Sequence, residues 1–170
     1  MMSSIPPEQT LVLCDFSQKD ELKNWNVVDD IVMGGRSQGN ILKTDNGFGL
    51  FSGRVSTANN GGFSSVRKSL SIADVSSYNT IFIIIKGDGK SYQVRLKANQ
   101  SDSFSYVQNI KTSGEWQTIE LALQDFYPVF RGRELNLPQF QKKSISEFAL
   151  LIGNKVNQNF ILEIAKVYLK

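Results

Sequence analysis

This 170-residue chain has no histidine and only one cysteine. Without histidine it lacks Ser-His-Asp and Cys-His catalysis, the usual zinc sites and the commonest general base near neutral pH. Enzymes can work with carboxylates alone, so this absence lowers the expectation of catalysis without removing it. A single cysteine excludes an intrachain disulfide. Cys14 lies in an apolar, strand-like run from Leu11 to Phe16, which predicts a buried structural thiol.

Long hydrophobic runs and dense positive charge are also missing. The longest apolar run, 81–85, is far too short to cross a bilayer, which predicts no membrane span. The N-terminus has no basic start, and Pro6-Pro7 interrupts it, so we expect no secretory signal and a cytoplasmic location. The net charge is +3, with Lys and Arg scattered along the chain. Nucleic-acid binding normally needs a denser basic face, so we expect no nucleic-acid partner.

Alternating apolar and polar residues recur along the chain, and helical periodicity is nearly absent. Residues 40–45 and 48–56 predict two strands around the turn Asp45-Asn46-Gly47. The continuously apolar run 80–85 predicts a central strand covered on both faces. Short helical turns are expected only at 19–25 and 121–126. The pattern predicts a single all-β domain over residues 1–170, an antiparallel sandwich whose core spans about residues 11–169.

Two of the predicted strands have one apolar side and one polar side. In the strand at 92–98 the apolar residues should face the core, which leaves Gln93 and Arg95 on the outer surface. Val66 pointing inward likewise places Ser65 and Arg67 outward. If these strands are neighbours, Arg67 and Arg95 share a polar concave face. The alternative is an ordinary solvated sheet face.

Two segments contain more loop-forming residues than a plain sandwich needs. Residues 25–37 include Asp29, Asp30, Met33, Gly34, Gly35 and Ser37, and residues 59–67 include Asn59, Asn60, Gly61, Gly62 and Phe63. Paired glycines allow positive φ and close backbone approach, and Asp or Asn side chains bond back to backbone amides. Both segments therefore predict rigid, shaped loops.

These segments together resemble the complex I intermediate-associated protein 30 family. The resemblance rests on Met-Gly-Gly-x-Ser at 33–37, Asn-Gly-Gly-Phe at 60–63 leading to Ser-x-Arg at 65–67, and Lys-Gly-Asp-Gly at 86–89 followed by Tyr92. Trp116, Asp-Phe at 125–126 and Phe-Arg-Gly-Arg at 130–133 follow in order. The match spans about residues 11–169, and the order of the pieces makes it specific.

The resemblance implies an antiparallel jelly-roll β-sandwich like the galactose-binding domains. It also implies a non-catalytic, chaperone-like or assembly role with a protein partner. We expect the contacts to come from the two loop segments, the outer residues Ser65, Arg67, Gln93 and Arg95, and the loop residues Arg131 and Arg133. No cofactor and no metal are expected.

Several alternatives remain open from the sequence. Carbohydrate or another small ligand on the concave sheet face is the second hypothesis. Asp29 and Asp30 are expected to shape loops by hydrogen bonding, but calcium coordination or acid-base catalysis together with Asp88 are alternatives. Arg131 and Arg133 belong either to a solvated loop or to a partner contact.

Overall fold

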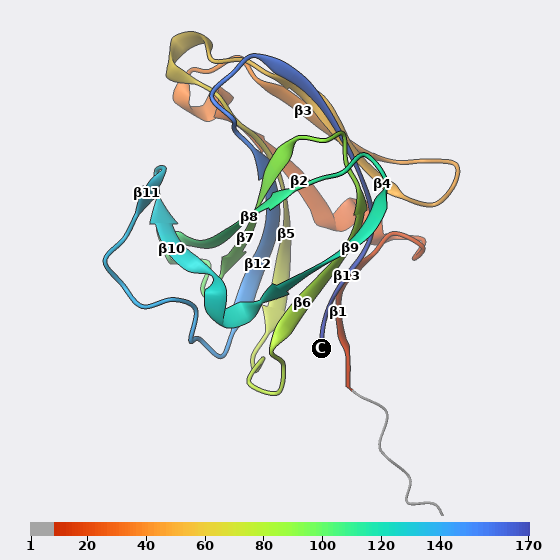
Figure 1. The fold of residues 1–170 in the computed structure, drawn as a ribbon, viewed down its shortest axis with the longest axis vertical. Coiled ribbons are helices and arrows are strands. Elements are labelled where there is room, and N and C mark those ends of the chain that lie inside the picture. The colour runs from red at the N-terminus through yellow and green to blue at the C-terminus, as the bar shows by residue number, and fades with distance from the viewer. Residues whose placement is uncertain (1–8) are drawn as a thin grey trace, which may run out of the picture.

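A computed structural model describes residues 9–170 as two antiparallel β-sheets packed face to face (Figure 1). Within these residues one sheet has the strand order β3-β4-β13-β6-β9, with β1 also pairing with β13. The other sheet has the order β11-β10-β8-β7-β12-β5-β2. This arrangement confirms the expected jelly-roll-type sandwich.

The first sheet contains β1 (Leu11–Asp15), β3 (Gln38–Lys43), β4 (Gly49–Val55), β6 (Thr80–Lys86), β9 (Trp116–Ala122) and β13 (Gln158–Leu169). The second sheet contains β2 (Trp25–Asp29), β5 (Ser64–Ile72), β7 (Ser91–Lys97), β8 (Ser105–Lys111), β10 (Tyr127–Phe130), β11 (Arg133–Glu134) and β12 (Ile145–Ile152). Four 3-10 turns complete the described chain: η1 (Glu21–Asn24), η2 (Asp30–Met33), η3 (Ala58–Asn60) and η4 (Leu123–Asp125). No helix in this part of the chain has the length and apolar character needed to cross a bilayer.

The core lies between the two sheets, where the alternating apolar residues predicted from the sequence meet. Val94 and Leu96 of β7 and Val66 of β5 are fully buried. Their neighbours Gln93, Arg95 and Arg67 are half-buried, whereas Ser65 is fully buried as well. Cys14 is buried in the same core, and this burial raises the pKa of its thiol. A buried, protonated thiol is unreactive, so the structural interpretation of Cys14 is confirmed.

The tight turns also follow the sequence. Gly47 has φ 86° at the tip of the β3–β4 hairpin, where a left-handed conformation favours glycine. The turns η1 and η4 fall inside the two segments expected to be helical. The expectation that helical turns occur only there was wrong, because η2 and η3 form in the two glycine-rich loop segments.

The strand covered on both faces is β12, not β6. In β6 only Ile81, Ile83 and Ile85 are fully buried, while Phe82 and Ile84 lie on the half-exposed outer surface. The prediction for residues 80–85 was therefore wrong in this respect. Every residue from Phe148 to Ile152 is buried, and β12 lies in the second sheet between β7 and β5.

A buried ion pair joins β5 to the segment that follows β1. Lys68 Nζ lies 2.7 Å from Glu21 Oε2, and both side chains are nearly buried. Lys68 also donates to the carbonyl of Leu13, and Trp25 Nε1 donates to Glu21. Trp25 in turn stacks on Phe16, so this polar network fixes one end of the aromatic core.

We predict that Lys68→Met destabilises the fold by roughly 3 kcal/mol, because it leaves the buried Glu21 carboxylate without its cation. Chemical denaturation with urea measures the change. Lys23→Met is the matched control, since Lys23 pairs with Asp20 in an exposed position and its loss should be nearly neutral. Equal effects of the two substitutions would contradict the structural role of the buried pair.

Candidate functional site

The side chain of Asp30 joins the two loop segments that the sequence singled out. Its carboxylate is completely buried and accepts hydrogen bonds from the backbone N–H groups of Ser37 (2.9 Å), Gly62 (2.5 Å) and Phe63 (3.1 Å). The Ser37 hydroxyl donates to it at 2.6 Å and accepts from the N–H of Ser56. One carboxylate thus fixes segments that lie more than thirty residues apart.

Two glycines of the motifs are explained by this carboxylate. A Cβ added to Gly35 or Gly61 would overlap the Asp30 side chain. Gly34 has φ 87° and closes the turn η2, a conformation that other residues rarely adopt. The Met-Gly-Gly-x-Ser and Asn-Gly-Gly-Phe motifs therefore specify close packing around one buried charge.

Hydrogen bonding lowers the pKa of Asp30. Burial alone would raise this pKa by penalising the charged form, but the donors from Ser37, Gly62 and Phe63 outweigh it. The carboxylate therefore stays ionised while carrying no exposed surface.

Asp29 and Asp88 also use their carboxylates to hold backbone. Asp29 accepts from the N–H of Gly39 at 2.9 Å and from the Ser64 hydroxyl. Asp88 accepts from the N–H groups of Lys90 (3.2 Å) and Ile161 (2.9 Å). The bond from Ile161 ties the β6–β7 turn to β13, and Tyr92 also donates its hydroxyl to Asp88.

The three carboxylates do not converge on one site. Among residues 9–170, no group of three or more Cys, Asp or Glu side chains is arranged to hold a metal ion. Each carboxylate instead accepts hydrogen bonds from its own set of amide or hydroxyl donors. The hypothesis of a carboxylate-dependent enzyme therefore lacks the group of catalytic residues that it required.

The outer face of the second sheet carries two arginines on either side of β12. Arg67 of β5 and Arg95 of β7 both lie directly opposite Ala149. Directly opposed residues in antiparallel strands share a face, so the two arginines flank a small side chain. Two strand spacings separate their backbones by about 10 Å. The sequence placed both residues on this face, and the structure shows that a third strand brings them together.

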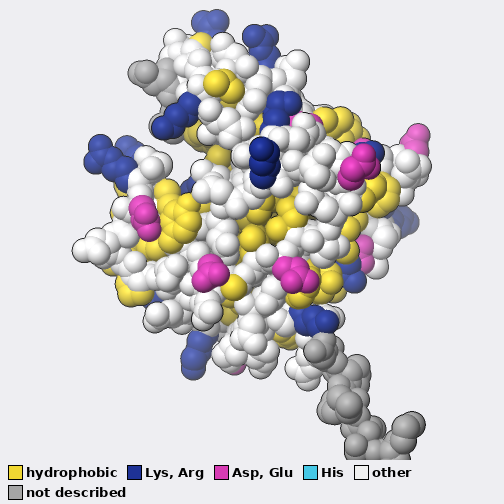
Figure 2. Space-filling view, viewed as in Figure 1, with side chains coloured by type: hydrophobic (Ala, Val, Ile, Leu, Met, Phe, Trp, Pro, Cys, Tyr) yellow, Lys and Arg dark blue, Asp and Glu magenta, His cyan; other side chains and the backbone are white. Residues whose placement is uncertain are grey.

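A cleft of about 700 Å³ opens above this face. Loops bound it on both sides, and Figure 2 shows the hollow with Lys and Arg side chains at both margins. Its lining residues are Asp30, Thr57, Gly61, Gly62, Phe63, Arg67, Gln93, Arg95, Arg131, Gly132, Leu151, Gly153 and Lys155. The outer face is therefore the floor of a cleft and not an open solvated surface.

The arginines in the cleft are bound to neutral partners. Arg95 Nη1 donates to Gln93 Oε1 at 2.7 Å, and Arg67 Nε donates to Ser65 Oγ at 3.1 Å. No carboxylate of the described chain lies within ion-pair distance of either guanidinium. Burial and the charge of Arg67 lower the pKa of Arg95, and the charge of Glu147 partly opposes this shift. The site holds unneutralised positive charge.

Arg131 reaches the cleft from a tight hairpin. Arg131 and Gly132 have φ 50° and 78° and form the two-residue turn between β10 and β11. Positive φ at both central positions is the geometry of a type I′ turn. The expectation that Arg131 and Arg133 lie in a loop was wrong, because this short hairpin fixes them. Arg133 is exposed and does not line the cleft.

Eight of the predicted contact residues line the cleft, and others support it from below. Asp29, Gly34, Gly35, Ser37, Asn59 and Ser65 lie outside the lining. The side chains of Met33 and Asn60 lie outside the described part of the structure. Five lining residues were not predicted from the sequence: Thr57, Gly132, Leu151, Gly153 and Lys155. The last three come from β12 and the loop after it. The sequence could not identify Leu151 as a cleft residue, because an apolar residue buried on the outer face of a sheet has the same sequence pattern as a core residue.

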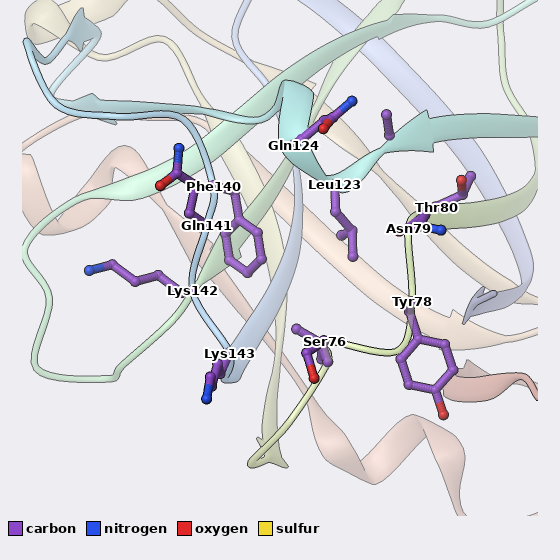
Figure 3. Close-up of a pocket in the computed structure, with 12 residues that line it drawn as sticks. Ser76, Tyr78, Asn79, Thr80, Leu123, Gln124, Phe140, Gln141, Lys142 and Lys143 are labelled. Atoms are coloured by element: carbon purple, nitrogen blue, oxygen red, sulfur yellow. The ribbon is translucent and has the colours of Figure 1, made fainter.

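A second cavity of about 530 Å³ lies near η4, where the β5–β6 loop approaches the segment before β12 (Figure 3). Leu123 and Phe140 point into it, and Lys142 and Lys143 lie along one wall. None of the predicted contact residues lines this cavity.

A family model described as complex I intermediate-associated protein 30 matches residues 14–164. The chain belongs to this family. Some of the motifs that carry the family resemblance build the Asp30 network or line the cleft, among them Gly35, Gly62 and Arg67.

Two curated relatives are named "Complex I intermediate-associated protein 30, mitochondrial". The mouse protein is 25% identical over 92% of this chain and 55% of its own length. The *Drosophila melanogaster* protein is 26% identical over 75% of this chain and 50% of its own length. The chain thus spans about half the length of these relatives. The expectation of a cytoplasmic location is wrong on this comparison, since both relatives are named as mitochondrial proteins.

Solved structures similar to this family member include carbohydrate-binding modules. A family 11 module from *Clostridium thermocellum*, in complex with a β-1,3-1,4-mixed-linked tetrasaccharide, has a TM-score of 0.65. It is 18% identical and covers 94% of both chains. A mutant of the family 29 module CBM29-2 has a TM-score of 0.54 at 8% identity, covering 95% of this chain and 91% of its own. At these identities the likeness shows the fold alone.

We predict that Asp30→Asn lowers the free energy of unfolding by roughly 3 kcal/mol, because the amide loses charge-assisted hydrogen bonds and points an N–H₂ group at other donors. Thermal or urea denaturation measures the loss. Asp45→Asn, in the exposed tip of the β3–β4 hairpin, is the control and should change stability little. If Asp30→Asn lost no more stability than Asp45→Asn, the result would contradict the proposed network.

The same carboxylate should make the fold sensitive to acid. The pKa of Asp30 is lower in the folded state than the ordinary 3.8. The ionised carboxylate therefore stabilises the fold fully above pH 3.8, and this stabilisation is lost as the pH falls through the lower folded pKa. Between about pH 6 and pH 3 the wild-type protein should therefore lose more stability than Asp30→Asn. Urea denaturation at both pH values measures this difference, and parallel losses would contradict it.

Proposed function

We propose that this chain is a non-catalytic protein-binding module with an assembly role, and that the arginine-lined cleft is its contact surface. The two curated relatives are named for their association with a complex I intermediate. The observation that carries the proposal is a built cleft of unneutralised arginines at the site defined by the family motifs.

The chemistry of the described residues supports binding over catalysis. Asp29, Asp30 and Asp88 are occupied by loop hydrogen bonds, and the chain contains no histidine. Arginine is favoured at interfaces because its planar fork binds carboxylates at two points. A rigid floor supported by Asp30 also limits the ordering cost of binding.

The proposal predicts that the epitope-tagged chain, expressed in its own host, co-purifies with complex I subunits and co-migrates with partly assembled complex on native gels. Mass spectrometry of the recovered material identifies the subunits. Replacing both Arg67 and Arg95 with Gln should reduce this recovery at least tenfold, because the cleft loses its charge.

The exposed Arg54 of β4, on the other sheet, supplies the control substitution Arg54→Gln, which should leave recovery unchanged. Melting temperatures of all variants establish that they are folded. Recovery of complex I subunits no greater than with an unrelated β-sandwich protein would refute the assembly role.

Carbohydrate binding is the second candidate function. Tyr127 of β10 lies opposite Val107, which lies opposite Arg95, so an aromatic ring shares the concave face. The Tyr127 hydroxyl accepts a hydrogen bond from Asn109, which is itself opposite Gln93. An aromatic ring beside planar polar groups is a common sugar-binding arrangement. A glycan array with wild-type protein tests this candidate, and absence of any hit at high protein concentration would reject it.

A further inference from the structure

The electrostatics of the cleft floor suggest which chemical group it binds. Arg67 and Arg95 are both half-buried, lie on either side of Ala149 and repel one another. Holding two like charges close together in partly desolvated positions is unfavourable unless a ligand compensates it. A bound anion would remove this repulsion. Part of its binding free energy would therefore come from relieving an unfavourable interaction that already exists in the free protein.

The nearest acidic side chain on this face does not neutralise the arginines. Glu147 lies two residues before Ala149 on β12, where it is directly opposite Lys97. No ion pair joins it to either guanidinium in the described chain. Asp30, the acid among the lining residues, is fully covered and already accepts four hydrogen bonds.

The guanidinium groups still have donors to offer. Arg95 uses Nη1 for Gln93, and Arg67 uses Nε for Ser65, so most N–H groups of both forks have no acceptor within the described chain. Both arginines line the cleft, whereas Ala149 between them is buried and does not line it. Carboxylates match this fork geometry with two parallel N–H···O bonds.

The remainder of the cleft is partly apolar. Leu151 and Phe63 line it beside the arginines, and Gly62 and Gly153 bring backbone close together without side chains. Arg131 lies over the ring of Phe130 at 5.3 Å, at the margin formed by the β10–β11 hairpin. A ligand that fits this lining has acidic groups next to apolar ones.

We propose that the cleft binds an acidic segment of a protein partner, with one carboxylate seated between Arg67 and Arg95 and a neighbouring apolar side chain against Leu151 and Phe63. This inference rests on the proposed function, because it identifies the chemistry of the partner's contact. Arg131 and Lys155 at the margins attract further acidic side chains of the same segment.

A direct binding experiment tests the inference. The probe is a short fluorescein-labelled peptide in which glutamate alternates with leucine and serine, compared by fluorescence anisotropy with the same peptide carrying glutamine for every glutamate. The wild-type protein should bind the glutamate peptide at least tenfold more tightly, and added salt should weaken this binding. Equal affinity for the two peptides would overturn the inference.

Two sets of variants locate the binding. Arg67→Gln and Arg95→Gln should each weaken binding of the glutamate peptide at least tenfold, while Arg54→Gln leaves it unchanged. Arg67→Lys and Arg95→Lys keep the charge but lose the planar fork, so they should bind with intermediate affinity and remain informative if a glutamine variant fails to fold. Full retention of affinity in either folded arginine variant would overturn the inference.

The experiment separates this inference from the proposed function and from sugar binding. If wild-type and Arg67→Gln/Arg95→Gln proteins recover complex I subunits equally, the assembly role stands and the cleft is not its contact. If the glutamate peptide requires both arginines but wild-type protein recovers no complex I subunit, the acidic-segment site stands and the assembly role falls. Binding of oligogalacturonate without binding of the glutamate peptide would overturn the inference and assign the cleft to an acidic sugar.

Discussion

The buried carboxylate of Asp30 is the constraint on which the rest of the site depends. It accepts hydrogen bonds from Ser37 on one side and from Gly62 and Phe63 on the other, so two loops distant in sequence behave as one rigid unit. A charge can be buried in this way only when several donors replace its water. The glycines around it are there because a side chain would fill the space of the carboxylate.

This rigid unit forms one side of the cleft, and a tight hairpin forms another part of its wall. Phe63 follows directly from the Asp30 network, and Arg131 is held by the two-residue turn between β10 and β11. Between them the floor consists of neighbouring strands in fixed register. The position of each charged group is therefore set by backbone hydrogen bonds, which allows unneutralised arginines to remain close together.

The family motifs acquire different physical meanings once the structure is known. The Gly-Gly pairs and the aspartates mainly build the loops, and Arg67 supplies charge to the cleft they enclose. Asp88, in the Lys-Gly-Asp-Gly motif, ties the β6–β7 turn to β13 and lies outside the cleft lining. A motif residue can thus be essential to a binding site without contacting the ligand.

The sequence by itself determined the class of fold and the direction of many side chains. Alternation placed Val66, Val94 and Leu96 inside and Arg67 and Arg95 outside, because successive residues of a strand face opposite sides of a sheet. It also predicted the Asp45-Asn46-Gly47 turn, where only local backbone conformation matters. These features depend on residues close together in the chain.

Only the tertiary structure decided which strands are neighbours. That β12 lies between β5 and β7, and that both of its faces are buried, depends on pairings across eighty residues and leaves no local pattern. The same pairings place Leu151 in the cleft, and the adjoining loop contributes Lys155. Strand order is set by the free energy of the whole packed sandwich, so the shape and charge of the cleft emerge only when both sheets are assembled.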